Sequence, residues 1–86
     1  MEAIFELSWM SEFPSLKARR LFRILQTAPL SYRVVRQRGS HRRLEAVGRP
    51  PLTFSFHDGR TIPPATVKRI LCKQVGLSED EALGLL

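Results

Sequence analysis

The sequence predicts a single α+β domain in which two helices cover one face of a three-stranded antiparallel sheet. Three observations carry this prediction: an apolar stripe of helical period before residue 29, strict alternation of apolar and polar residues over 52–57, and a second helical stripe after the prolines at 63 and 64. With 86 residues, of which 43% are hydrophobic, the chain has the length of one domain and enough apolar side chains for a core. The expected order is helix, three strands, helix, and a short C-terminal helix.

The first helix is expected from Pro14 to Ala28. Its apolar residues recur at i, i+3, i+4, i+7 and i+10, which places them on one face, and basic residues occupy the other faces. Pro29 ends the helix, because proline lacks the amide hydrogen that the helix needs. We assign residues 14–86 to the domain and residues 1–13 to an N-terminal extension. The apolar positions are Ala18, Leu21, Phe22, Leu25 and Ala28.

Three strands are expected between the helices. Residues 32–38 are β-branched and aromatic at their centre, and the tight turn Gly39-Ser40 leads into a second strand over 41–47. The sequence Gly-Arg-Pro-Pro at 48–51 is expected to break this strand, and the third strand follows over 52–57. The resulting sheet has one apolar face for the helices to cover and one face open to solvent.

The second helix opens at Pro63-Pro64, because proline is tolerated in the first turn of a helix. Gly76 lies where a left-handed residue is expected to end it. Ser78 and Glu81 have the spacing of a capping box, which predicts a short last helix running to the C-terminus.

Residue parity predicts which side chains share the open face. Leu44 must face the core together with the phenylalanines of the third strand, so His41 and His57 point the other way. Two registers satisfy this parity: a five-residue hairpin loop places His41 opposite His57, and a three-residue loop places His57 opposite Arg43. In either register the two histidines of the chain are expected close together, among Arg36, Arg38 and Arg43.

Positive charge is concentrated in the body of the chain. The net charge is +6, but all 14 Lys and Arg residues and only two acids, Glu45 and Asp58, lie between residues 13 and 78. This density indicates a polyanionic partner, most often nucleic acid. Cys72 is the only cysteine, so neither an internal disulfide nor a zinc site of the usual spacing is expected. The sequence shows neither a signal peptide nor a membrane span, and we expect a cytoplasmic protein.

Two histidines among arginines suit the cleavage of RNA without a metal ion. In that reaction the ribose 2′-OH attacks the adjacent phosphate, a base takes its proton, an acid protonates the leaving 5′-oxygen, and cations stabilise the phosphorane. The alternative is a non-catalytic module that binds double-stranded RNA through shape and phosphate. From the residues alone catalysis is the less common interpretation, because surface histidines beside arginines more often only contact phosphate.

Two sequence signatures resemble those of the HicA toxins, the small toxin partners of bacterial and archaeal toxin–antitoxin pairs. The first is Arg-x-x-Gly-Ser-His over 36–41, and the second is Ile-Pro-x-x-Thr over 62–66, opening a helix that closes with Lys-Gln-x-Gly over 73–76. The resemblance implies a double-stranded-RNA-binding-like fold. It also implies a type II toxin that acts as an mRNA interferase, an endoribonuclease. With the chemistry of the two histidines among arginines, we expect this cleavage to need no metal ion or other cofactor.

The resemblance further implies that His41 is the essential catalytic residue, and His57 is a weaker candidate for assisting it. The implied partners are mRNA and a HicB-like antitoxin whose surface covers His41. Many relatives have a second histidine where this chain has Arg42, whose side chain is expected to point away from His41. The residues expected to contact RNA are Arg36, Arg38, Ser40 and Arg43 on the sheet, and Lys68, Arg69 and Lys73 on the second helix.

Overall fold

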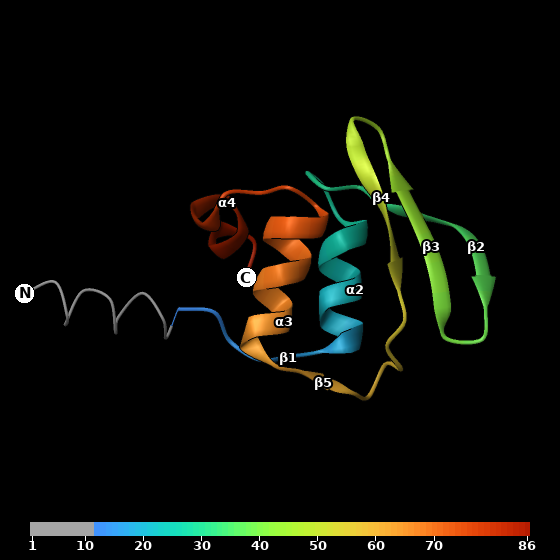
Figure 1. Ribbon diagram of the computed structural model, residues 1–86, viewed down its shortest axis with the longest axis horizontal. Helices are drawn as coiled ribbons and strands as arrows, with labels where there is room; N and C mark the ends of the chain where they lie inside the picture. Colours follow the sequence, from blue (N-terminus) through green and yellow to red (C-terminus); the bar gives the residue numbers. More distant parts are fainter. Residues whose placement is uncertain (1–11) are drawn as a thin grey trace, which may run out of the picture.

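The computed structural model describes residues 12–86, and its main helices and strands follow the predicted order (Figure 1). The predicted α+β class with a three-stranded antiparallel sheet is confirmed. The elements are β1 (Leu16–Lys17), α2 (Ala18–Gln26), β2 (Arg33–Arg38), β3 (His41–Ala46), β4 (Arg49–Phe54), β5 (Thr61–Ile62), α3 (Pro64–Lys68), the π-helical segment η1 (Arg69–Gln74) and α4 (Glu79–Gly84).

The molecule has a helical layer and a sheet. Helices α2 and α3 lie side by side, and the strands follow in the order β4, β3, β2 with increasing distance from α2 (Figure 1). All six residues of β2 are exposed, including Val34 at 36% and Val35 at 44%. The helices therefore cover β4 and part of β3 but leave β2, one edge of the sheet, uncovered on both faces.

The core forms where α2 meets the sheet. Leu44, Leu52 and Phe54 are buried, as the alternating pattern predicts for the apolar face. Phe54 is only 1% exposed, and its ring centroid lies 5.6 Å from that of Phe22 on α2 and 5.3 Å from that of Phe56. These aromatic contacts join the first helix to the end of the third strand.

The beginning of the domain differs from the prediction. The first helix starts at Ala18 rather than at Pro14, because Leu16 and Lys17 are extended and pair with β5. This two-residue ladder is too short to leave a periodic signal in the sequence. Ala28 lies beyond the end of the helix and is exposed. Of the predicted extension, residues 1–11 lie outside the described residues, whereas Phe13 is buried in the core.

The hairpin between β3 and β4 corrects both predicted registers. Ala46 pairs with Arg49 across the two-residue turn Val47-Gly48, and Gly48 has a positive φ of 75°. The register then shifts by one residue between Ala46 and Leu44, so that Leu44 pairs with Leu52, and neither the five-residue nor the three-residue loop is formed. The predicted parity is nevertheless confirmed, because Leu44 and Phe54 face the core together.

The strand limits explain this error. The prolines at 50 and 51, which were expected to break the chain, lie within β4. An edge strand tolerates a proline whose nitrogen points outward, and the register shift between Leu44 and Ala46 lies opposite the two prolines. β4 accordingly starts at Arg49 and ends at Phe54, so His57 lies in the following loop and not in a strand.

The C-terminal half follows the predicted signals more closely. The second helix opens at Pro64 and continues as η1, whose π-helical hydrogen bonds the sequence does not reveal. Gly76 has a φ of 92°, in agreement with its predicted role after the helix. The capping box is confirmed: the backbone N–H of Glu81 donates to Ser78 Oγ, and the backbone N–H of Ser78 donates to Glu81 Oε1.

This capping box makes the stability of α4 dependent on pH. The backbone hydrogen bond from Ser78 lowers the pKa of Glu81 below its usual value of 4.5. The carboxylate therefore stabilises the fold above about pH 4.5, and this contribution is lost as the pH falls through the lower folded-state pKa. We expect Glu81→Ala to lower the free energy of unfolding at pH 7 and to lower it by less at pH 3.5, because it removes the carboxylate that accepts the Ser78 N–H. Urea denaturation at the two pH values measures this, and an equal loss at both would contradict it.

Within residues 12–86, no helix combines the length and the hydropathy needed to cross a membrane.

Candidate functional site

The open face of the sheet carries a row of basic side chains at the β2–β3 hairpin. Arg38 pairs with His41 directly across the Gly39-Ser40 turn, and Arg36 pairs with Arg43. Gly39 has a φ of 59°, which the two-residue turn requires and which glycine adopts without strain. Because directly opposed residues in a ladder share a face, the hairpin brings three arginines and His41 to one side of the sheet.

A β-bulge at Val35 makes this arrangement possible. Before it Val34 pairs with Leu44, and after it Arg36 pairs with Arg43, so Val35 has no direct partner. Strict alternation from the buried Tyr32 would place Arg36 on the covered face. The extra residue reverses the parity of the strand and turns its last arginines to the open face.

These side chains surround a hollow of about 490 Å³. Its lining includes no carboxylate, and among the described residues no group of three or more His, Cys, Asp or Glu side chains is placed to hold a metal ion. The hollow is therefore suited to an anion and unfavourable for a divalent cation. Its lining residues are Arg36, Gln37, Arg38, His41, Arg43 and Thr53.

Two of these lining residues, Gln37 and Thr53, were not predicted. Thr53 lies on β4 and pairs with Arg43 of β3. The alternation of residues in the third strand already places Thr53 on the open face. Gln37 donates from Nε2 to the carbonyl oxygen of Gly39 at 3.1 Å, which no sequence pattern indicates. Thr53 adds a neutral hydroxyl to the cationic hollow, whereas Gln37 pairs with Arg42 of the covered face and its amide is bonded to the turn.

Neither predicted register is formed, so His57 pairs across the sheet with neither His41 nor Arg43. His41 is exposed at the first position of β3, whereas His57 is exposed in the loop after β4 and does not line the hollow. Ser40 lies in the hairpin turn, half-buried, and is likewise not part of the lining. His41 is thus the only imidazole among the side chains that line this hollow.

The three predicted cations of the second helix line a separate hollow of about 500 Å³. Lys68 Nζ lies 3.1 Å from Glu79 Oε2, so this charge is shared with a carboxylate, and it also lies 5.8 Å from the ring centroid of Phe13. Cys72 belongs to the same hollow, and burial, followed by the charge of Glu79, raises the pKa of its thiol. A raised pKa leaves the thiol protonated at neutral pH and is not that of a reactive cysteine.

Arg42 occupies the covered face, as the parity of β3 predicts. Its guanidinium lies 4.4 Å from the ring centroid of Phe22, and Nη2 lies 3.1 Å from Asp58 Oδ1. The side chain is 15% exposed, and Nη1 is buried without a hydrogen-bond partner in the part of the chain that the structure describes. Arg42 therefore holds the loop after β4 against the sheet, on the side away from His41.

Comparison with models of known protein families finds a match over most of the chain. The model of the family described as "HicA toxin of bacterial toxin-antitoxin" matches residues 18–77, from the start of α2 to the residue after Gly76. The chain belongs to the HicA toxin family. Comparisons with curated proteins and with solved structures find no match.

Membership agrees with the observed architecture and with the resemblance in the two sequence signatures. The α+β arrangement with a three-stranded antiparallel sheet is consistent with the double-stranded-RNA-binding-like fold of HicA toxins. The family is known for ribonuclease activity, and a toxin of a toxin–antitoxin system implies an antitoxin as its partner. Both signature segments fall within the matched residues.

Proposed function

We propose that this HicA-family toxin is a metal-independent endoribonuclease of a type II system that cleaves mRNA in the hollow of the β2–β3 hairpin. The observation that carries the proposal is the pairing of Arg38 with His41, which sets an exposed imidazole beside a guanidinium in a hollow free of lining carboxylates. An imidazole transfers protons near neutral pH, and guanidinium groups bind phosphate through several N–H donors.

The reaction follows from these groups. The 2′-oxygen of the ribose bonds to the adjacent phosphorus as its proton leaves to a base, and the bond from phosphorus to the 5′-oxygen breaks as that oxygen gains a proton. The products are a 2′,3′-cyclic phosphate and a 5′-hydroxyl. His41 performs one of the two proton transfers, and the three arginines of the hairpin stabilise the negative charge that develops on the phosphorane.

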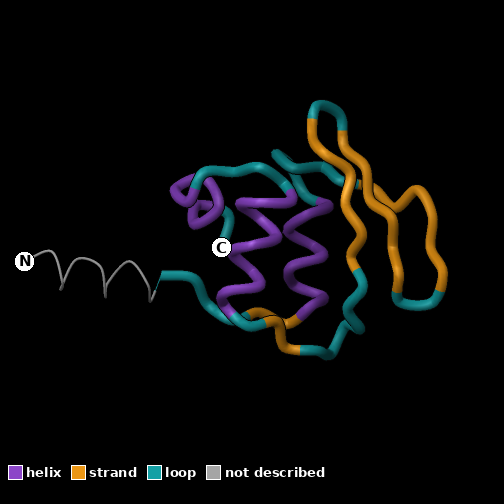
Figure 2. The backbone as a smooth tube through the Cα atoms, viewed as in Figure 1, coloured by secondary structure: helices purple, strands orange, loops and turns teal. Residues whose placement is uncertain are grey.

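His57 is a weaker candidate for the other proton transfer. Its loop leaves β4 at the end of the molecule where the β2–β3 turn also lies (Figure 2). His57 does not line the hollow, so its imidazole acts only on a reacting oxygen that the bound RNA presents outside the hollow. Water is available for the same step at an exposed site.

A HicB-like antitoxin in the cytoplasm is the proposed protein partner. The cationic hairpin favours an acidic surface on that protein, since opposite charges guide association and specify the partner. An antitoxin seated there covers His41 and excludes RNA from the hollow.

The purified toxin should cleave an RNA oligonucleotide equally well with and without excess EDTA. A matched oligonucleotide with one 2′-deoxyribose before the scissile phosphate should stay intact at that position, because the attacking hydroxyl is missing. Mass spectrometry of the products should detect the 2′,3′-cyclic phosphate. Loss of cleavage in EDTA would contradict the metal-independent reaction, and RNA that is bound but recovered intact would indicate the non-catalytic binding module.

A further inference from the structure

The loop between β4 and β5 is held firmly although it has no regular secondary structure. Its carbonyl groups accept hydrogen bonds from three residues at the start of the domain, and its carboxylate pairs with Arg42. These contacts fix residues 57–60 to both the sheet and the first helix. They are Ala18 N to Arg60 O at 2.8 Å, Arg19 N to Asp58 O at 3.2 Å, Lys17 Nζ to Gly59 O at 3.1 Å and Arg42 Nη2 to Asp58 Oδ1 at 3.1 Å.

Arg60 extends from this loop as a cation that rests on an aromatic ring and forms no salt bridge within residues 12–86. Its guanidinium carbon lies 5.6 Å from the ring centroid of Phe56, and that ring packs edge-on against Phe54 in the core. None of the described acidic residues forms a salt bridge with Arg60. Both the backbone and the aromatic support of this guanidinium are therefore fixed before any ligand binds, which reduces the entropy lost on binding.

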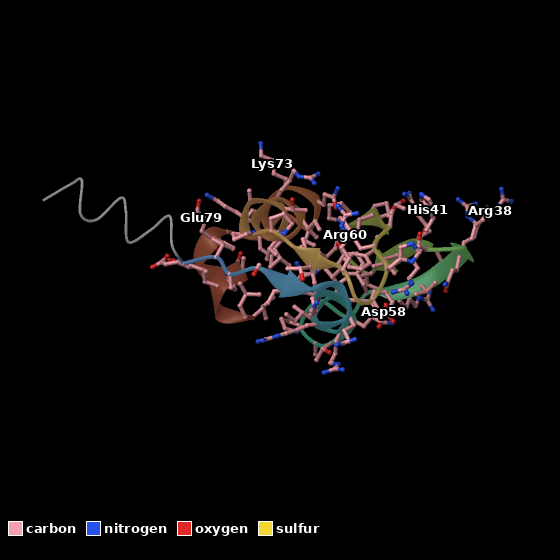
Figure 3. The ribbon with its side chains drawn as sticks, turned by 90° about the horizontal axis from the view of Figure 1, so that it is seen from below. Arg38, His41, Asp58, Arg60, Lys73 and Glu79 are labelled. Atoms are coloured by element: carbon pink, nitrogen blue, oxygen red, sulfur yellow. The ribbon has the colours of Figure 1, made fainter. Side chains whose placement is uncertain are left out.

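The position of Arg60 connects the two basic hollows. In Figure 3 Arg60 lies between Lys73 and His41 along the length of the molecule, on the same side as both, whereas Asp58 lies toward the opposite side. Lys73 lines the hollow on η1, and His41 lines the hollow of the hairpin. The acid of this loop is thus turned away, and the cation is presented to the side that carries both hollows.

We infer that Arg60 binds an RNA phosphate between the two hollows, so that a single strand of RNA runs from η1 across the β4–β5 loop to His41. The inference rests on the proposed function for its ligand, RNA. A single strand suits this path because its backbone bends to follow cations on different elements. Arg60 acts by holding the strand outside the hollow and takes no part in bond breaking.

Binding of RNAs of two lengths tests this path. The probes are a trinucleotide, which fills only the hairpin hollow, and a dodecamer, both with 2′-deoxyribose at the scissile position so that neither is cleaved. Arg60→Gln should weaken binding of the dodecamer by about tenfold and lower the slope of log K against log salt by about one, while the trinucleotide binds as before. Arg60→Lys should restore most of the affinity for the dodecamer, because it keeps the charge.

Arg23→Gln is the matched control, because Arg23 is an exposed arginine in the last turn of α2, at the opposite end of that helix from the loop. It should leave both affinities unchanged. An Arg60→Gln variant that binds the dodecamer normally, or that loses the trinucleotide equally, would overturn the path. Wild-type protein that binds both RNAs but cleaves no RNA with normal ribose would refute the proposed function alone, and failure to bind RNA would refute both.

Discussion

His41→Ala should reduce the rate of RNA cleavage by about 100- to 10,000-fold, the usual contribution of a positioned acid or base. The variant should keep its fold, because His41 is exposed at the first position of β3 and its imidazole has no hydrogen-bonded partner among the described residues. RNA binding should change little, since the three arginines of the hairpin remain. Cleavage of a fluorescent RNA, affinity for a 2′-deoxy-substituted RNA and growth on overexpression together measure these effects.

His57→Ala provides the matched comparison, because it removes the other imidazole from a site that does not line the hollow. We expect it to retain most of the cleavage rate and to alter at most one limb of the pH–rate profile. If His41→Ala still cleaves RNA and still arrests growth, the catalytic assignment is wrong. If His57→Ala is the inactive variant instead, the chemistry lies in the β4–β5 loop rather than in the hairpin.

Phe54→Ala should have the largest effect on stability, lowering the free energy of unfolding by about 3 to 5 kcal/mol. Phe54 is 1% exposed and touches the rings of Phe22 and Phe56, so the substitution empties the centre of the contact between α2 and the sheet. A small domain has a total stability of about 5 to 15 kcal/mol, and such a loss leaves a large part of it unfolded under mild stress.

Phe54→Leu is the control for this prediction, since it retains an apolar side chain and should cost clearly less than the alanine variant. Urea denaturation followed by circular dichroism gives both free energies. A loss below about 1 kcal/mol for Phe54→Ala would show that the aromatic cluster does not carry the core. A loss of RNA affinity in Phe54→Leu at unchanged stability would indicate that the cluster also supports the ring beneath Arg60.

The sequence predicted the fold well where one element produces a complete local signal. Apolar periodicity located α2, alternation identified the covered face of β4, and the spacing of Ser78 and Glu81 identified the cap of α4. It failed where the outcome depends on a partner in space. The prolines at 50 and 51 were interpreted as a break in the strand, because the role of proline at a sheet edge becomes visible only once the strand order is known. The β1–β5 ladder was missed because it joins two-residue segments about 45 positions apart in the sequence.

The candidate site was predictable in its residues and not in its geometry. Parity placed Arg43 and His41 on the open face and Arg42 on the covered face. It did not foresee the bulge at Val35, without which Arg36 would lie under the sheet, because a bulge depends on competing constraints at both ends of a strand. Tyr32 fixes one end by burial and by a 2.7 Å hydrogen bond from its hydroxyl to the carbonyl oxygen of Pro50, and the Gly39-Ser40 turn fixes the other.

The two edges of the small sheet differ in their ability to pair with a further strand. β4 carries Pro50 and Pro51, which lack backbone donors, whereas β2 has no proline, and all six of its residues are exposed. Addition of a further strand is thus directed to β2, where a second molecule pairing through its own β2 would set arginine against arginine. The same charges that attract RNA consequently oppose sheet-to-sheet aggregation of the toxin, and a strand from another protein that docks at β2 must bring acidic side chains with it.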